Sequence, residues 1–232
     1  KMALAESCDV YFYDLARRLT IDTMHDYLEG FGFGARSGID TTAERPGVLP
    51  STAWKRAAMG QPWYPGETLS AGIGQGYMLA TPLQLAVATS IVATRGVHRE
   101  PRLVQWFGEE RLATPLHDPV LADPGLWDAI IDGMREVVHG RRGTARAIGR
   151  NIDYQMAGKT GTAQVIGIAQ DAVYNEDEID ERHRNHGLFV AFAPLEAPTI
   201  AVAVIVENGG GSSAAYPIAR TVIDNWLSGR AG

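Results

Sequence analysis

The sequence predicts an α+β fold in which an antiparallel sheet is layered between helices. Three apolar stretches rich in β-branched residues are typical of strands: one that starts near residue 154, one over 187–192 and one over 199–206. They follow one another with short or looped connections, an order that favours antiparallel pairing. Helical patterns precede them and another covers 215–227, so we expect helices and sheet to form layers.

The composition is that of a globular protein. The 232 residues are 45% hydrophobic and 21% charged, which allows one large domain or two small ones with a sizeable core. A net charge of −6 without a basic cluster argues against nucleic acid as a partner. Cys8 is the only cysteine, which excludes an internal disulfide. We expect it to be a small buried side chain, and a metal site around it would need ligands from upstream residues.

The first part of the sequence is predicted to be helical. Apolar residues recur there at helical spacing: Leu4, Cys8, Phe12, Leu15 and Leu19. No cap or turn precedes them, so we expect the sequence to begin inside a structured region and to be the C-terminal part of a larger domain. Ser7 and Asp9 interrupt the pattern, as residues that start helices and turns do. A second helix is predicted from about Asp22 to Glu29, with glycines after it.

The next part alternates loops with short helices. Residues 37–50 are predicted as a loop, after which Ser51 caps a short helix to Met59. Residues 61–66 are predicted as a turn-rich aromatic loop. Residues 70–77 contain three alternating glycines, which indicates a tight segment where backbones approach closely.

Stronger start signals mark the elements that follow. Thr81 and Pro82 begin an apolar helix that is expected to end before Gly96 and to lie in the core. A hairpin is predicted over 102–112. Asp123-Pro124 begins a helix that ends near His139, and a short helix is predicted over 144–148.

A long polar, acid-rich segment over 169–186 is predicted to be a mobile insertion. His183 and His186 are three residues apart and could share one face of a helix, but a metal site there would need further ligands. A solvated loop is therefore the favoured interpretation. A glycine-rich turn is predicted over 208–213, before the terminal helix.

The most informative stretch covers 156–165 and contains Lys159, Thr160, Gly161 and Thr162. It is predicted to be a short strand at an exposed edge of the sheet. Alternation places Lys159 and Gly161 on one face and the two threonines on the other. Gly161 removes a side chain where a ligand or another backbone would lie close. A cation, two hydroxyls and backbone N–H groups on an open edge suit an anionic, amide-containing ligand.

This stretch has two other interpretations. A phosphate-binding loop needs a glycine five residues before Gly158, where Asp153 stands, and it needs a helix afterwards. Residues 162–166 are short, apolar and β-branched, which favours a strand instead. A surface strand with an incidental lysine remains open on the tetrapeptide alone, because so short a motif is only a hypothesis.

A serine-containing tripeptide at a helix turn, followed much later by Lys-Thr-Gly on a strand, resembles the motifs of penicillin-binding proteins and serine β-lactamases. Further stretches resemble the transpeptidase domain of class B penicillin-binding proteins: 70–76, 81–84, 189–194 and 206–210. Asp9, where asparagine is usual, and residues 182–186 are similar to the cell-elongation type of that class. The resemblance covers nearly all of residues 1–232 and implies the C-terminal part of one transpeptidase domain.

The family nucleophile is a serine three residues before a lysine, and the sequence has no Ser-x-x-Lys. The nearest imitation runs from Thr52 to Lys55, with threonine in place of serine and in the wrong region. Because the motif precedes the serine tripeptide in the family, we expect the nucleophile upstream of this chain, together with a membrane anchor and an N-terminal domain. The resemblance implies an enzyme of the bacterial inner membrane whose catalytic domain is periplasmic.

The activity implied by the resemblance is that of a peptidoglycan D,D-transpeptidase. The upstream serine attacks the carbonyl between two D-alanines of a stem peptide, and an amine from a neighbouring stem takes the acyl group. The implied partners are stem peptides ending in D-Ala-D-Ala, β-lactams that mimic them, and a glycosyltransferase and other membrane proteins of the elongation complex. We expect no cofactor and no metal.

The resemblance also implies a role for each site residue. Ser7 would relay a proton to the leaving amine, and Lys159 would lie within a hydrogen bond or one water of it and keep the site positive. Asp9 would position the substrate amide, although an ionised carboxylate only accepts hydrogen bonds. Thr160 and Thr162 would hold the terminal carboxylate, and the N–H of Thr162 would form half of the oxyanion hole.

The resemblance leaves two alternative functions open. A β-lactamase of the same fold would hydrolyse the acyl-enzyme, but it needs a deacylating base that no motif here supplies. A sensor module or scaffold that binds penicillin without turnover is the alternative outside enzymes.

Overall fold

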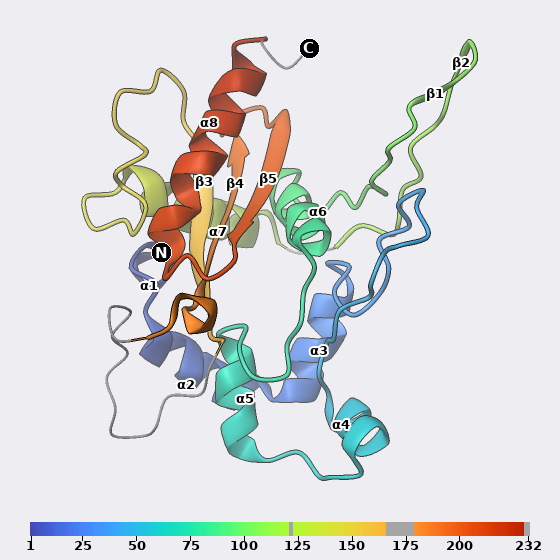
Figure 1. Ribbon diagram of the computed structural model, residues 1–232, viewed down its shortest axis with the longest axis vertical. Coiled ribbons are helices and arrows are strands. Elements are labelled where there is room, and N and C mark those ends of the chain that lie inside the picture. The colour runs from blue at the N-terminus through green and yellow to red at the C-terminus, as the bar shows by residue number, and fades with distance from the viewer. Residues whose placement is uncertain (121–122, 166–178, 230–232) are drawn as a thin grey trace. The chain divides into compact units, whose positions relative to one another are not determined.

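The computed structural model describes residues 1–120, 123–165 and 179–229 (Figure 1). The chain forms two compact units. The first consists of Lys1–Ser7 with Asp128–Gly232, and the second of Cys8–Trp127.

The first unit contains a three-stranded antiparallel sheet with the order β3-β4-β5. Its strands are β3 (Ala157–Ala163), β4 (His186–Ala193) and β5 (Ile200–Val206). Lys159 of β3 pairs with Val190 of β4, and Val190 pairs in turn with Ala203 of β5. The predicted antiparallel sheet and the α+β class are therefore confirmed, and β3 is an edge strand among the described residues.

A close approach within the sheet explains one glycine of β3. A Cβ at Gly158 would lie 2.5 Å from Cζ of Phe189 and 2.8 Å from the carbonyl oxygen of Val190. Phe189 is fully buried, so its ring cannot move into solvent. Only glycine lets β3 pass this ring while it keeps its register with β4.

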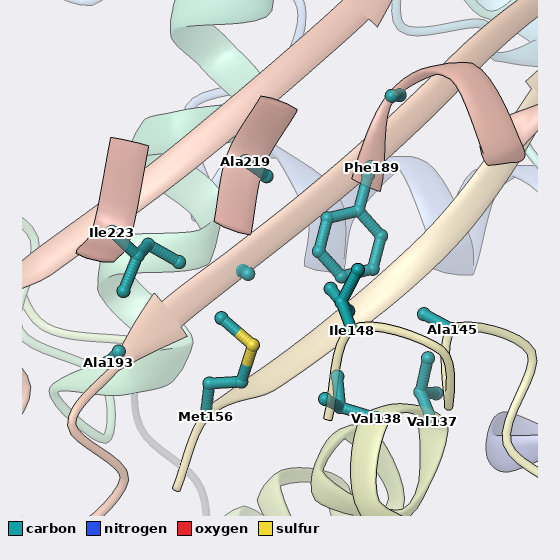
Figure 2. Packing of buried hydrophobic residues seen from close by; sticks show 11 residues of the cluster. Val137, Val138, Ala145, Ile148, Met156, Phe189, Ala193, Ala219 and Ile223 are labelled. Atoms are coloured by element: carbon teal, nitrogen blue, oxygen red, sulfur yellow. The ribbon is translucent and has the colours of Figure 1, made fainter. Parts of the chain in front are cut away.

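Helix α8 (Tyr216–Leu227) packs on one face of this sheet, as predicted (Figure 1). Phe189, Ala191 and Ala193 alternate along β4 and so share that face. Figure 2 shows the ring of Phe189 and the side chain of Met156 within the same buried cluster as Ile223 of α8. The complete cluster is Val137, Val138, Ala145, Ile148, Met156, Phe189, Ala191, Ala193, Ala215, Ala219 and Ile223. Burying each large apolar side chain stabilises the fold by about 1.5–3 kcal/mol.

A polar network joins α8 to the segment that leads into β3. The hydroxyl of Tyr154 donates to Oδ1 of Asp224 at 2.6 Å, and Nε of Arg220 donates to Oδ2 of the same carboxylate at 2.6 Å. Nη1 of Arg220 also donates to the carbonyl oxygen of Ile148 at 2.7 Å. Burial and the neighbouring carboxylate raise the pKa of Tyr154 well above its usual value, so it stays a hydrogen-bond donor.

Helix α7 (Pro124–His139) begins at the predicted proline and ends at the predicted histidine. The short helix predicted over 144–148 is wrong, because these residues form turns. The turns lie against the last carbonyls of α7, where the N–H of Ala145 donates to the oxygen of Val137 at 2.9 Å. A Cβ at Gly143 would lie 2.3 Å from the oxygens of Glu136 and Val137, so this glycine lets the chain fold back onto the helix end.

The first unit also contains three short helical elements. They are α1 (Met2–Ala5), the 3-10 turn η1 (Glu181–His183) and the 3-10 turn η2 (Ser212–Ala214), the last within the predicted glycine-rich turn. His183 ends η1 but His186 begins β4, so the two histidines do not share a helix face. Nδ1 of His186 accepts from the N–H of Asn208 at 2.9 Å. Residues 169–178 of the predicted mobile insertion lie outside the described residues.

The second unit contains five helices and a hairpin among its described residues. They are α2 (Asp9–Leu19), α3 (Ile21–Glu29), α4 (Thr52–Met59), α5 (Pro65–Gly72), α6 (Pro82–Ala93), β1 (Trp106–Phe107) and β2 (Glu110–Arg111). Ser51 caps α4 as predicted, because its hydroxyl accepts from the N–H of Trp54 at 3.0 Å. Thr81 and Gln84 form a capping box at the start of α6, also as predicted.

Two predictions for this unit are wrong. Residues 65–72 form α5 rather than loop and tight segment, because Pro65 and Glu67 supply the first-turn signals of a helix start. Cys8 is exposed rather than buried, because it stands at the N-cap of α2 outside the helix. In the residues that the structure describes, no group of three or more His, Cys, Asp or Glu could hold a metal ion, and no helix is long and apolar enough to cross a membrane.

Replacing Gly158 by alanine tests the packing of β3 against Phe189. The added methyl group meets the buried ring and a backbone oxygen, so we expect a loss of about 1–3 kcal/mol in the free energy of unfolding. Gly66→Ala is the matched control, because Gly66 lies in α5 and a Cβ at this position meets no atom within 4 Å. Urea unfolding of both variants measures the difference; equal stabilities would contradict the packing argument.

His139 predicts a pH dependence of stability. Its Nε2 accepts from the N–H of Met156 at 3.1 Å, and burial, with Arg135 nearby, holds its pKa below the usual 6.5. Since the unfolded chain binds the proton more readily, the contribution of His139 is complete above about pH 6.5 and is lost as the pH falls below it. When the pH falls from about 7.5 to about 5.5, the free energy of unfolding should decrease more for the unaltered protein than for His139→Gln. The glutamine keeps a hydrogen-bond acceptor but does not titrate. Urea unfolding at both pH values measures the two decreases, and equal decreases would refute the role of His139.

Candidate active site

The centre of the site is a contact between two residues that are 152 positions apart. Nζ of Lys159 donates to Oγ of Ser7 at 2.8 Å and to the carbonyl oxygen of Thr160 at 2.8 Å. Both side chains belong to the first unit. The predicted proximity of Ser7 and Lys159 is therefore confirmed.

Local geometry presents Ser7 to the lysine. Helix α1 ends at Ala5, and Ser7 adopts a positive φ of 52° before α2 begins at Asp9. A left-handed residue turns the chain sharply between two helices. Ser7 is half-buried at this turn.

The edge strand β3 supplies the other groups. Lys159 is half-buried, Thr160 is only 9% exposed, and Thr162 is exposed near the end of the strand. A Cβ at Gly161 would lie 3.2 Å from Cβ of Leu188, so this position is tight within its own sheet. The strand thus holds an ammonium group and two hydroxyls within four consecutive residues.

One residue near the site was missed by sequence reasoning. The Oγ1 atoms of Thr144 and Thr160 are 2.8 Å apart, so one hydroxyl donates to the other. The N–H of Thr144 donates to the carbonyl oxygen of Ala5, at the end of α1, at 3.3 Å. The only sequence signal was the Gly143-Thr144 pair after the end of a predicted helix, and it did not indicate a contact with β3.

Asp9, the remaining predicted site residue, is the first residue of α2 and belongs to the second unit. Its side chain is exposed. The structure brings together Ser7, Lys159 and Thr160, and the role predicted for Asp9 stays a prediction.

The lysine of the Ser-x-x-Lys imitation has a structural role. Lys55 is fully buried, its Nζ donates to the carboxylate of Glu67, and it lies 4.5 Å from the ring centroid of Tyr64. The rings of Trp63 and Tyr77 lie within 5.7 Å of the same ammonium group. The carboxylate and the rings satisfy the buried charge of this lysine, which is therefore a structural residue and is not placed to activate a nucleophile.

The arrangement around Lys159 suits two chemical tasks. An ammonium beside a hydroxyl keeps the local potential positive and can pass a proton through that hydroxyl. Hydroxyls and a cation together also bind a carboxylate by charge-assisted hydrogen bonds.

Comparisons with known proteins show the family of the chain. Residues 1–224 match the family model described as the penicillin binding protein transpeptidase domain. The chain is 38% identical, over 98% of its length, to the peptidoglycan D,D-transpeptidase MrdA of Escherichia coli strain K12, and it spans 37% of that protein. It therefore covers about a third of the length of this curated relative.

Solved structures resemble the chain as a whole. Penicillin-binding protein 2 (PBP2) of Pseudomonas aeruginosa, in complex with WCK 5153, superposes with a TM-score of 0.84 at 46% identity, covering 97% of this chain and 48% of the other. PBP2 of Helicobacter pylori, in complex with MreC, gives a TM-score of 0.77 at 33% identity, covering 90% of this chain and 36% of the other. Because the family model matches nearly every residue, the chain belongs to the penicillin-binding protein transpeptidase domain family.

Proposed function

We propose that this chain is part of a peptidoglycan D,D-transpeptidase that cross-links stem peptides during cell-wall synthesis and is a target of β-lactams. The observation that carries the proposal is the 2.8 Å hydrogen bond from Nζ of Lys159 to Oγ of Ser7 on an edge strand that also bears Thr160 and Thr162. The identity to MrdA of E. coli and to PBP2 of P. aeruginosa supports it. The nucleophilic serine lies outside the chain, because the 232 residues contain no Ser-x-x-Lys.

The residues of this chain serve acylation in three ways. When the serine attacks the carbonyl between two D-alanines, the bond to the terminal D-alanine breaks and its nitrogen needs a proton. Ser7 relays that proton, and the ammonium of Lys159 holds the hydroxyl in place. The N–H of Thr162 stabilises the oxygen anion of the tetrahedral intermediate as half of the oxyanion hole.

Substrate recognition uses the hydroxyls of the edge strand. Thr160 and Thr162 hold the terminal carboxylate of the stem peptide, and the charge of Lys159 favours the anion. Asp9 positions the substrate amide as a hydrogen-bond acceptor. The same groups hold the carboxylate of a β-lactam. After acylation the opened β-lactam stays attached to the nucleophilic serine. An incoming amine from a neighbouring stem completes the reaction by taking the acyl group and releasing the serine.

The relatives of this chain support a proposal for the setting of the enzyme. The H. pylori PBP2 that resembles this chain was solved as a complex with MreC. We place the catalytic domain in the periplasm at the inner membrane, with an MreC-type protein and a glycosyltransferase of the elongation complex as partners. Copurification of the complete protein with these membrane proteins from cross-linked cells tests this placement.

Lys159→Ala in the complete protein tests the electrostatic role. Loss of the ammonium should slow acylation by penicillin about 10²- to 10⁴-fold, the range for a lost acid–base group. Its thermal unfolding should change little by comparison. Lys1→Ala is the matched control, because Lys1 is an exposed lysine of the same unit whose ion pairs among the described residues lie at the surface. An unchanged acylation rate in Lys159→Ala refutes the role.

The position of the acylated residue tests the rest of the proposal. The complete protein, incubated with a fluorescent penicillin and digested, should carry the label on a peptide outside residues 1–232. Ser7→Ala should keep the same labelled peptide and form the adduct more slowly, since it loses the relay and not the nucleophile. A stoichiometric adduct on Ser7 or on any other residue of this chain, mapped by mass spectrometry, contradicts the assignment.

A further inference from the structure

Thr144 links the two parts of the site through its main chain and its side chain. Its N–H donates to the oxygen of Ala5 at 3.3 Å, two residues before Ser7. Its hydroxyl is 2.8 Å from the hydroxyl of Thr160 on β3. The residue therefore touches both the end of α1, two residues before Ser7, and the strand that carries Lys159.

The position of Thr144 is fixed by its neighbours along the chain. Gly143 lies so close to the last carbonyls of α7 that no side chain fits there, and Ala145 is fully buried with its N–H bonded to Val137 at 2.9 Å. Both neighbours are thus anchored to the end of α7. The hydroxyl of Thr144 is presented to Thr160 by a part of the fold that cannot easily shift.

The hydrogen bonds of the Thr160 hydroxyl indicate what Thr144 does. A hydroxyl has one proton to donate and two lone pairs to accept with. Nζ of Lys159, which can only donate, is 3.5 Å from Oγ1 of Thr160. If Thr144 also donates to this oxygen, both lone pairs are engaged and the proton of Thr160 is left for a third partner.

We propose that Thr144 is a positioning residue for carboxylate recognition: it donates to Thr160, so that the hydroxyl of Thr160 points its proton at the terminal carboxylate of the ligand. This inference rests on the proposed function, in which Thr160 contacts that carboxylate. The chain of hydroxyls polarises along its length, which strengthens the last hydrogen bond to the anion. Thr144 itself does not touch the ligand.

The experiment compares acylation by benzylpenicillin with acylation by its methyl ester, which lacks the negative charge. In Thr144→Val the second-order rate constant for the acid should fall about fivefold to tenfold, since a hydrogen bond to a charged group weakens, while that for the ester should change little. The preference for the acid over the ester therefore shrinks. Thr144→Ser, which keeps the hydroxyl, should restore the preference to within about twofold of the original.

Thr221→Val is the matched control in the same unit. Its hydroxyl bonds only within α8, to the oxygen of Pro217 at 3.1 Å among the described contacts, so the acid-to-ester preference should stay unchanged. A merely structural role for Thr144 would lower both rate constants equally, and that result, or an unchanged preference in Thr144→Val, overturns the inference. Should Thr144→Val fail to fold, the same ratio in Thr144→Ala decides.

The two proposals fail in different ways. If the unaltered protein forms no adduct or does not prefer the acid, the proposed function and this inference both fall. If the unaltered protein prefers the acid and Thr144→Val keeps that preference, only the role of Thr144 falls.

Discussion

The candidate site depends on the hydrogen bond from the ammonium of Lys159 to the hydroxyl of Ser7, and the rest of the first unit must bring these two groups together. Neither residue can be brought to the other by local structure, because 152 positions separate them. The sheet must place β3 at its edge, and α1 must end just before Ser7. Burying part of a cation costs free energy unless its N–H donors have acceptors. The carbonyl oxygen of Thr160 and the hydroxyl of Ser7 accept from the ammonium of Lys159 and so offset that cost.

Sequence reasoning succeeded where one local signal decided the outcome. Ser51 and Thr81 are strong caps, and both helices begin where they stand. Strand order followed from three apolar stretches with short or looped connections. The pairing of Ser7 with Lys159 came from the motif resemblance alone, because no periodicity relates residues so far apart in sequence.

The misses share a physical cause, which is that long-range packing overrides local pattern. Residues 144–148 have a helical composition, but Gly143 and the bond from Ala145 to Val137 fold them onto the end of α7. Cys8 fits the apolar stripe of a predicted helix. The left-handed φ of Ser7 ends that helix before Cys8, which therefore lies at the exposed N-cap of the next helix. Thr144 was missed for the same reason, since its contacts depend on where these turns dock.

The packing of the core also decides on which side of β3 the ammonium emerges. Side chains along a strand alternate, so a slip of one residue against β4 would send Lys159 to the opposite face. The buried ring of Phe189 resists that slip, because only Gly158 leaves room for it beside β3. Ile148 and residues of helix α8 belong to the same buried cluster as this ring. The chemistry at the exposed edge is therefore fixed by apolar packing several residues away, and the polar groups need only complete the geometry that the core provides.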